Sequence, residues 1–401
     1  MLNLANQLIL RWPKAETPHV SLLKEAGIEA VLLPEANPAF SEAAKAAGIT
    51  TEALASVPNL KTTGLWPGIR RNTARRGRDI EVASASREPW VDANSYLVAY
   101  ERALNPGQPA LLAYEANEAA GVRPDVEIPF DTLELALIEA RVAGGNYLLD
   151  MPARFREKLL AKDPKAVDAW HSLGKTAAWL KQNQQLFGRP MLPEITQLVE
   201  AGATTRELSN LLHRRGGSPS VVNAASVPAP SPKILALVAA GLKQVPPTAF
   251  AHAEAGATVV IDVPPPPNVK LIRQEADRTF NSLGKGTIVA YQKRILDPSE
   301  FALDVIDLIT HKRRAARLWN ASSAIPLAMQ GETPQEAILH VINYGSPAQE
   351  EIQAHIQGKF SKAVLLCPEQ DVRTLKTASR GASTEVFLPS LRRLATVRFS
   401  N

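Results

Sequence analysis

Two glutamates and an asparagine follow a short apolar stretch in the first third of the chain. Ala110 to Tyr114 comes after a Pro-Gly turn and predicts a buried strand. Glu115, Asn117 and Glu118 follow directly. In folds with parallel strands, functional side chains gather at the carboxyl ends of the strands. Carboxylates in this position suit general acid and base catalysis, whereas solvated charges that flank the next segment are the alternative.

Another carboxylate ends a second apolar stretch. Tyr147 to Asp150 predicts a strand, so Asp150 is expected at the same carboxyl edge as Glu115 and Glu118. Two of these three groups could then act on one substrate bond. The alternative for Asp150 is a helix N-cap, because Pro152 follows at a first-turn position.

A second polar cluster follows the predicted strand Ile80 to Ala85. It combines an aromatic ring, for the apolar face of a sugar, with charged and amide groups for its hydroxyls. Its members are Arg87, Glu88, Trp90, Asp92 and Asn94. The alternative is that the tryptophan packs under the loop and that Asp92 or Asn94 caps the helix predicted from Tyr96.

Two further tryptophans, Trp12 and Trp66, come near predicted strand ends and could line the same sugar-binding site. Core packing is the alternative. The arginine-rich run from Arg70 to Arg78 has no interleaved aromatics and indicates a solvated loop rather than a nucleic-acid contact. The histidines show no metal-ligand spacing, so we expect no catalytic metal and no other cofactor.

The elements that must position these residues begin as a βα repeat. Strands are predicted at 8–12, 29–33, 60–65, 80–85, 110–114 and 147–150, and helices at 19–26, 39–47, 96–104 and 133–143. Gly27 and Gly48 each follow a helix, where a left-handed residue is needed before the next strand. Seven or eight strands before residue 190 predict a compact TIM-like (β/α) barrel over residues 1–190.

Two further domains are predicted after a break at residues 188–193. Residues 191–296 alternate strands and helices and predict an open, flavodoxin-like α/β domain. Residues 297–401 hold short strands separated by Gly, Pro and Asn, which predict a C-terminal antiparallel β-sandwich. The predicted fold class is therefore multidomain α/β.

Composition argues against several classes of protein. The chain has 401 residues, 45% of them hydrophobic and 21% charged, which is typical of globular proteins. Its net charge of +5 is mild for this length, so no nucleic-acid partner is expected. No apolar run is long enough to span a membrane. The amino terminus lacks a signal-peptide pattern, which predicts a cytoplasmic protein as given, and a secreted or periplasmic one if a signal was removed.

This order of domains resembles that of the three-domain bacterial β-galactosidases, whose middle domain serves trimerisation. The segment from Gly241 to Pro264 is similar to the helix-Gly-strand element of those domains and of class I glutamine amidotransferases. The single cysteine, Cys367, lies in the predicted β domain, so amidotransferase chemistry is not expected. Asn117 and Glu118 match the Asn-Glu dipeptide that carries the acid/base glutamate in these glycosidases.

The resemblance implies a carbohydrate substrate, a β-linked sugar, a homotrimer and two catalytic carboxyls among Glu115, Glu118 and Asp150. Such carboxyls lie about 5 to 5.5 Å apart in retaining enzymes and roughly 6.5 to 9.5 Å apart in inverting ones. The leading alternative is a catalytically inactive carbohydrate-binding or assembly protein with the same architecture. An interaction protein with no role in sugar chemistry is the third possibility.

Overall fold

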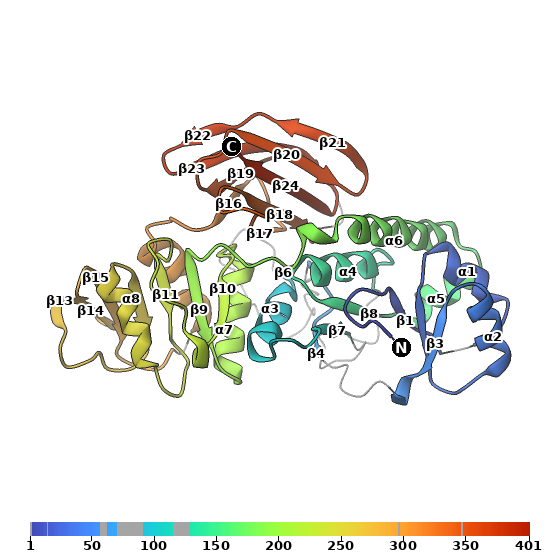
Figure 1. Ribbon diagram of the computed structural model, residues 1–401, viewed down its shortest axis with the longest axis horizontal. Coiled ribbons are helices and arrows are strands. Elements are labelled where there is room, and N and C mark those ends of the chain that lie inside the picture. The colour runs from blue at the N-terminus through green and yellow to red at the C-terminus, as the bar shows by residue number, and fades with distance from the viewer. Residues whose placement is uncertain are drawn as a thin grey trace, which may run out of the picture.

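Three groups of strands succeed one another along the chain. The computed structural model describes residues 2–13, 15–56, 62–69, 91–114, 128–295, 297–345 and 348–401. A parallel sheet comes first, a mostly parallel sheet follows, and two antiparallel sheets come last. Figure 1 shows the first two groups along the long axis, with the C-terminal strands above the region where they meet. The predicted mixture of parallel α/β and antiparallel β structure is confirmed.

The first sheet has six parallel strands in the order β3-β2-β1-β8-β7-β4. Its strands are β1 (Ile9–Arg11), β2 (Ala30–Leu33), β3 (Thr50–Ala53), β4 (Thr62–Thr63), β7 (Leu111–Ala113) and β8 (Asn146–Asp150). A short antiparallel pair, β5 (Gly68–Ile69) and β6 (Val91–Asp92), lies outside this sheet. In the described part of the chain β3 and β4 are edge strands and do not pair with each other. The predicted strand at 80–85 lies outside the described residues.

Helices link these strands or follow the last of them. They are α1 (His19–Glu25), α2 (Pro38–Ala46), α3 (Ser95–Leu104), α4 (Thr132–Val142), α5 (Ala153–Leu160) and α6 (Pro164–Gln182). Gly27 and Gly48 have φ values of 69° and 83°, as the sequence predicts. A Cβ at either position would meet no atom within 4 Å, so backbone conformation and not space requires glycine there.

The middle sheet has the order β10-β9-β11-β12-β15-β14-β13. Its strands are β9 (Ile195–Val199), β10 (Ser220–Asn223), β11 (Ala236–Val238), β12 (Thr258–Ile261), β13 (Lys270–Gln274), β14 (Arg278–Leu283) and β15 (Gly286–Tyr291). The first five along the order are parallel and the last two are antiparallel. Helices α7 (Ala203–Arg214) and α8 (Phe250–Ala255) connect parallel strands.

The helix after this sheet belongs to its core. The chain forms α9 (Pro298–Leu303) and a π-helical segment (Asp304–Ile309). Phe301, Val305 and Ile306 are buried with side chains of β9, α7 and β15. The predicted boundary at residue 297 groups this helix with the C-terminal strands, whereas its apolar side chains pack in the core of the middle sheet.

The C-terminal strands form two antiparallel sheets with a shared core. One sheet has the order β16-β19-β23-β22 and the other β17-β18-β24-β20-β21. Their bounds are β16 (Ala316–Trp319), β17 (Ala324–Gln330), β18 (Ala337–Asn343), β19 (Gln349–Gln357), β20 (Lys362–Cys367), β21 (Gln370–Leu375), β22 (Ala378–Arg380), β23 (Ser383–Leu391) and β24 (Leu394–Ser400). Alternate residues of β18 face two cores: Leu339 and Val341 the C-terminal one, Ile338 and Ile342 the core of the first sheet.

Candidate functional site

The carboxyl edge of the first sheet carries Asp150, the one predicted catalytic residue that the structure describes. Asp150 ends β8, and its Cα pairs in register with that of Arg11 at the end of β1. The Arg11 guanidinium donates from Nη1 to Asp150 Oδ2 over 3.3 Å, and about a third of the Asp150 side chain (33%) is exposed. Helix α5 has Pro152 at its N-cap and no side-chain cap, so the N-cap alternative for Asp150 is wrong.

Glu115, Asn117 and Glu118, and likewise Arg87, Glu88 and Trp90, lie outside the described residues. The distances that separate these carboxyls from Asp150 therefore stay predictions.

Asp92 contacts the middle unit. It ends β6, and its Oδ1 forms a largely buried ion pair with Arg214 Nη2 of α7 at 3.5 Å. Its carboxylate is thus bound across two units of the fold. Neither helix capping nor exposure to a ligand, the two predicted roles, describes this contact.

Asn94 is buried at the N-cap position of α3 but does not cap the helix. Its side chain bonds the backbone of Leu65 instead: Oδ1 accepts from the Leu65 N–H over 2.8 Å, and Nδ2 donates to the Leu65 carbonyl over 2.7 Å. Gly64 is required beside it, because a Cβ there would lie 2.5 Å from Asn94 Oδ1. Asn94 therefore fixes the chain after β4.

The same asparagine bonds a buried carboxyl group that the sequence analysis misses. Glu139 of α4 accepts from the Asn94 N–H and from Asn94 Nδ2, each over 2.7 Å. It also accepts from Tyr114 Oη at 2.7 Å and from Tyr344 Oη, next to β18, at 3.1 Å. Burial raises the pKa of Glu139 to about 7, although these hydrogen bonds favour the carboxylate.

A sequence signal for Glu139 exists. Helix α4, TLELALIEARV, is buried nearly all round, and a helix that is apolar on every side belongs in a core. Polar residues inside such a helix must find partners, since a buried unpaired carboxyl is costly. Glu134, on the same helix, follows this rule too: it accepts from Thr176 Oγ1 at 2.6 Å and pairs with Arg392.

The two described tryptophans of the predicted site lie in the core. Trp12 is 0% exposed and packs in a T-shaped contact with His19. Trp66 is buried against Tyr114, with ring centroids 5.2 Å apart, and Tyr114 in turn contacts Tyr147 at 5.0 Å. The structure supports the core-packing alternative for both tryptophans, because neither offers a ring face to solvent.

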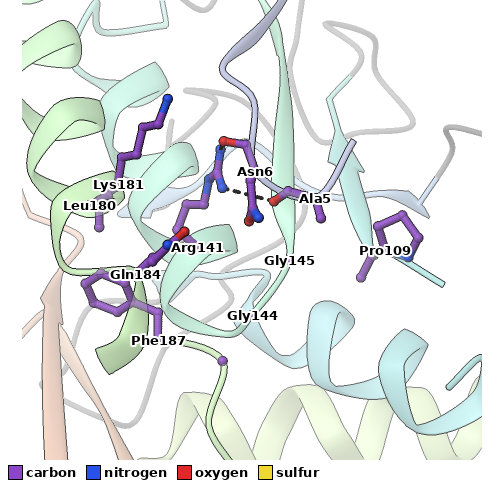
Figure 2. Close-up of a pocket in the computed structure, with 12 residues that line it drawn as sticks. Ala5, Asn6, Pro109, Arg141, Gly144, Gly145, Leu180, Lys181, Gln184 and Phe187 are labelled. Atoms are coloured by element: carbon purple, nitrogen blue, oxygen red, sulfur yellow. Dashed lines mark hydrogen bonds between the residues drawn. The ribbon is translucent and has the colours of Figure 1, made fainter. Parts of the chain in front are cut away.

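A cavity lies at the opposite end of the sheet. It has a volume of about 220 Å³ and lies beside Ala110 and Gly145, at the amino ends of β7 and β8 (Figure 2). Arg141 borders it, donating to the backbone carbonyls of Ala5 and Asn6 over 2.9 and 2.7 Å. The guanidinium thus anchors the amino-terminal segment. This cavity is separate from the edge that carries Asp150.

The described residues hold no cluster of His, Cys, Asp and Glu suited to a metal ion. No helix within the described ranges is long and apolar enough to cross a membrane. Cys367 is buried in β20, and burial raises the pKa of its thiol to about 12.

Comparisons with known proteins give a fold but no family. No family model and no curated sequence matches the chain. The structure is similar to α-L-fucosidase isoenzyme 2 from Paenibacillus thiaminolyticus, with a TM-score of 0.56 and 8% identity over 99% of both chains. The β-galactosidase from Bacillus circulans sp. alkalophilus matches with a TM-score of 0.49 and 11% identity, over 77% of this chain and 58% of its own.

The cold-adapted β-galactosidase from Rahnella sp. R3 matches with a TM-score of 0.47 and 11% identity, over 98% of this chain and 63% of its own. The chain thus spans less than two thirds of either β-galactosidase. The likeness to the α-L-fucosidase shows that the two chains share a multidomain fold.

Proposed function

We propose that this chain is a glycosidase-like protein that acts on a β-linked sugar at the carboxyl edge of the first sheet. The observation that carries the glycosidase-like part of the proposal is the likeness in fold to the α-L-fucosidase over 99% of both chains. The β-linkage comes from the resemblance of the domain order to the three-domain β-galactosidases. One fold can host many chemistries, so the reaction must be argued from the residues of the site. Asp150, at a strand end and partly exposed, is the described group suited to it.

In this proposal Asp150 works with Glu118 or Glu115, and Arg87, Glu88 and Trp90 bind the sugar. Glycoside hydrolysis needs one carboxyl that donates a proton and one ionised carboxylate. Asp150 forms an ion pair with the Arg11 guanidinium, a setting that suits the nucleophile or base. One of the two glutamates would then supply the acid.

We also propose the finer architecture that the sequence suggests. Residues 1–190 form a compact TIM-like barrel. Residues 191–296 form a flavodoxin-like domain, in whose core the helix over residues 298–309 also packs, and the strands that follow this helix form a β-sandwich. In support, the parallel strands of the middle sheet lie in the order 2-1-3-4-5 when they are numbered within that sheet. A homotrimer, if present, would appear in light scattering as three times the 43.4 kDa chain mass.

A second function, carbohydrate binding without hydrolysis, is favoured by a different observation. Asp92 is tied to Arg214, and Glu139 is buried among four hydrogen bonds. Neither carboxylate is therefore available to pair with Asp150. If Glu115 and Glu118 also take no part, binding is the function that remains.

The test is hydrolysis of α- and β-linked nitrophenyl galactosides, fucosides, glucosides, mannosides and rhamnosides. We expect turnover of a β-glycoside. Asp150→Asn should lower kcat/KM by at least about a hundredfold, as should Glu118→Gln or Glu115→Gln, because general acid-base groups contribute about that much. Arg11→Gln is the matched control: it removes the same ion pair but keeps the carboxylate, so it should cost much less.

Several outcomes would contradict this assignment. Unchanged hydrolysis in Asp150→Asn would remove Asp150 from the reaction, and equal losses in Asp150→Asn and Arg11→Gln would make the ion pair structural. Sugar binding without turnover of any glycoside would favour the second function.

A further inference from the structure

Two adjoining cavities lie between α6 and the amino-terminal segment of the chain. The first has a volume of about 220 Å³ (Figure 2) and the second a volume of about 170 Å³. Both are bordered by Asn6, Arg141, Leu180 and Lys181, so they meet along a shared wall. Each is smaller than the roughly 300 Å³ at which pockets for drug-sized ligands begin, so a ligand here would be small.

Arg141 brings a largely buried positive charge to this shared wall. Its two Nη atoms donate to three backbone carbonyls, those of Ala5, Asn6 and Gln7. Carbonyls carry no net charge, and Arg141 forms no ion pair with any residue that the structure describes. Burial lowers the pKa of Arg141 to about 10, and Glu29 offsets this shift only in part. A buried charge without a counterion is costly, so the wall favours an anion beside it.

The other charged groups near the first cavity are also cations. Lys181 is the second charged residue that lines it, and no acidic side chain of the described residues does so. Arg102 lies against the wall at Gly144, where a Cβ would collide with its guanidinium. It donates to the carbonyls of Ala143 and Gly188 over 2.9 and 3.0 Å, and it too has no ion pair within the described ranges. The carboxylate of Glu29, bonded to Lys181 Nζ over 2.5 Å, thus faces three cations.

The neutral part of the lining suits an organic molecule. Asn6 and Gln184 contribute amide groups, which can bond to hydroxyl or carbonyl groups. Leu180 and Phe187 contribute an apolar side. A small ligand could therefore place its charge near the cations and its body against these residues.

We propose that the first cavity binds a small organic oxyanion, a phosphate ester or a carboxylate, whose charge is compensated by Arg141 and Lys181. Gln184 bonds the polar body of this ligand, and Phe187 packs against its apolar part. The cavity lies at the end of the sheet opposite to Asp150, so this proposal does not depend on catalysis at that edge.

The test is a thermal-shift screen of the full-length protein with small anions at millimolar concentration and fixed ionic strength. The probes are inorganic phosphate, glucose 6-phosphate, gluconate and citrate, with neutral glucose as the comparison. Glucose 6-phosphate and gluconate distinguish the two kinds of oxyanion. We expect at least one organic anion, and not glucose, to raise the melting temperature, because a ligand that binds only the folded state stabilises it. Titration calorimetry with the anion that binds best then gives its affinity.

Gln184→Glu is the first variant, because it places a carboxylate in the cavity wall and leaves Arg141 and its hydrogen bonds intact. It should weaken binding of the chosen anion by at least about tenfold, since like charges repel. Gln185→Glu is the matched control: this neighbour is exposed and does not line the cavity, so the same change there should leave binding unchanged. Asp150→Asn should also leave it unchanged.

Lys181→Gln is the second variant, used if Gln184→Glu lowers the melting temperature of the ligand-free protein. The Lys181 side chain is 63% exposed, so its loss should spare the fold and weaken binding by about two- to fivefold. The proposal is overturned if no organic anion binds, if neither cavity variant weakens binding, or if Gln184→Glu and Gln185→Glu weaken it equally, which would mean that anions follow only the net charge of +5. Loss of binding in Asp150→Asn would place the anion at the other edge of the sheet and would overturn it too.

Discussion

Glu139 is the buried carboxyl group on which separate segments of the fold converge. Asn94 and Tyr114 bond it from the first unit and Tyr344 from the end of β18. No cation takes part in these bonds, so burial dominates and the pKa is raised from 4.5 to about 7. The folded protein therefore prefers the protonated group up to near neutral pH, and the carboxyl makes stability depend on pH.

Glu139→Gln tests this dependence. As pH rises from about 4.5 to about 7, the unfolded chain releases this proton before the folded one, so the group destabilises the fold increasingly and the effect levels off above pH 7. Relative to the unmodified protein, Glu139→Gln should gain about 3 kcal/mol of unfolding free energy over this range. Urea denaturation at several pH values measures the difference.

The unfolding free energy of Glu139→Gln must be compared with that of the unmodified protein, because other buried groups titrate too. Burial lowers the pKa of His213 to about 4 and of His340 to about 3, so these two groups make the folded protein less stable as pH falls. They are present in both proteins and cancel. Glu157→Gln, at an exposed position of α5, should change stability by less than about 0.5 kcal/mol throughout. Parallel curves for Glu139→Gln and the unmodified chain would contradict the assigned pKa.

At the scale of elements, α6 begins at a cap that its sequence specifies. Asp163 Oδ1 accepts from the N–H groups of Lys165 and Ala166, and Pro164 occupies the first helical position. Asp163→Ala should lower the free energy of unfolding by about 1 kcal/mol, because two N–H groups lose their acceptor. Asp168→Ala, an exposed position on the same helix, should change it by less than about 0.5 kcal/mol. Equal effects in urea denaturation would exclude a capping role.

Elements marked by a clear local sequence pattern could be predicted from the sequence. Elements without such a pattern could not. The βα repeat is marked by Gly27 and Gly48, which follow their helices in the left-handed conformation. Strand β13, KLIRQ, was missed because all five residues are exposed, so no alternation marks it. Its pairing with β14 also shifts register between Leu271 and Arg273, a bulge that protects an edge strand from pairing with another chain.

The candidate site was predicted less well than the fold. The sequence places Asp150 at a strand end, as the structure confirms, but not its ion pair with Arg11, because register between distant strands is not a local property. Glu139 was missed because its partners Asn94 and Tyr344 are far away in sequence. Trp12 and Trp66 pack in the core because apolar neighbours cover the strand ends where they lie.

At the scale of the whole molecule, β18 joins the C-terminal sheets to the first unit. Ile342 is buried in the cluster that also holds α4 residues such as Leu135, whereas Leu339 of the same strand is buried in the C-terminal core. The imidazole of His340, between them, lies 2.9 Å from Thr396 Oγ1 through Nδ1 and 3.1 Å from the Leu186 carbonyl through Nε2. One strand thus serves two cores, and its two faces can be weakened separately.

Ile342→Ala and Leu339→Ala form a matched pair for this junction. Each removes a buried aliphatic side chain from β18, so each should cost about 2 to 5 kcal/mol of unfolding free energy. Amide hydrogen exchange should separate them under native conditions. Ile342→Ala leaves a void against α4, so the amides of Thr132–Val142 should exchange faster, while Leu339→Ala should affect mainly β18, β20 and β24. If both variants accelerate exchange in α4 equally, the C-terminal sheets and the first unit open as one cooperative body, and the two faces of β18 are not energetically separate.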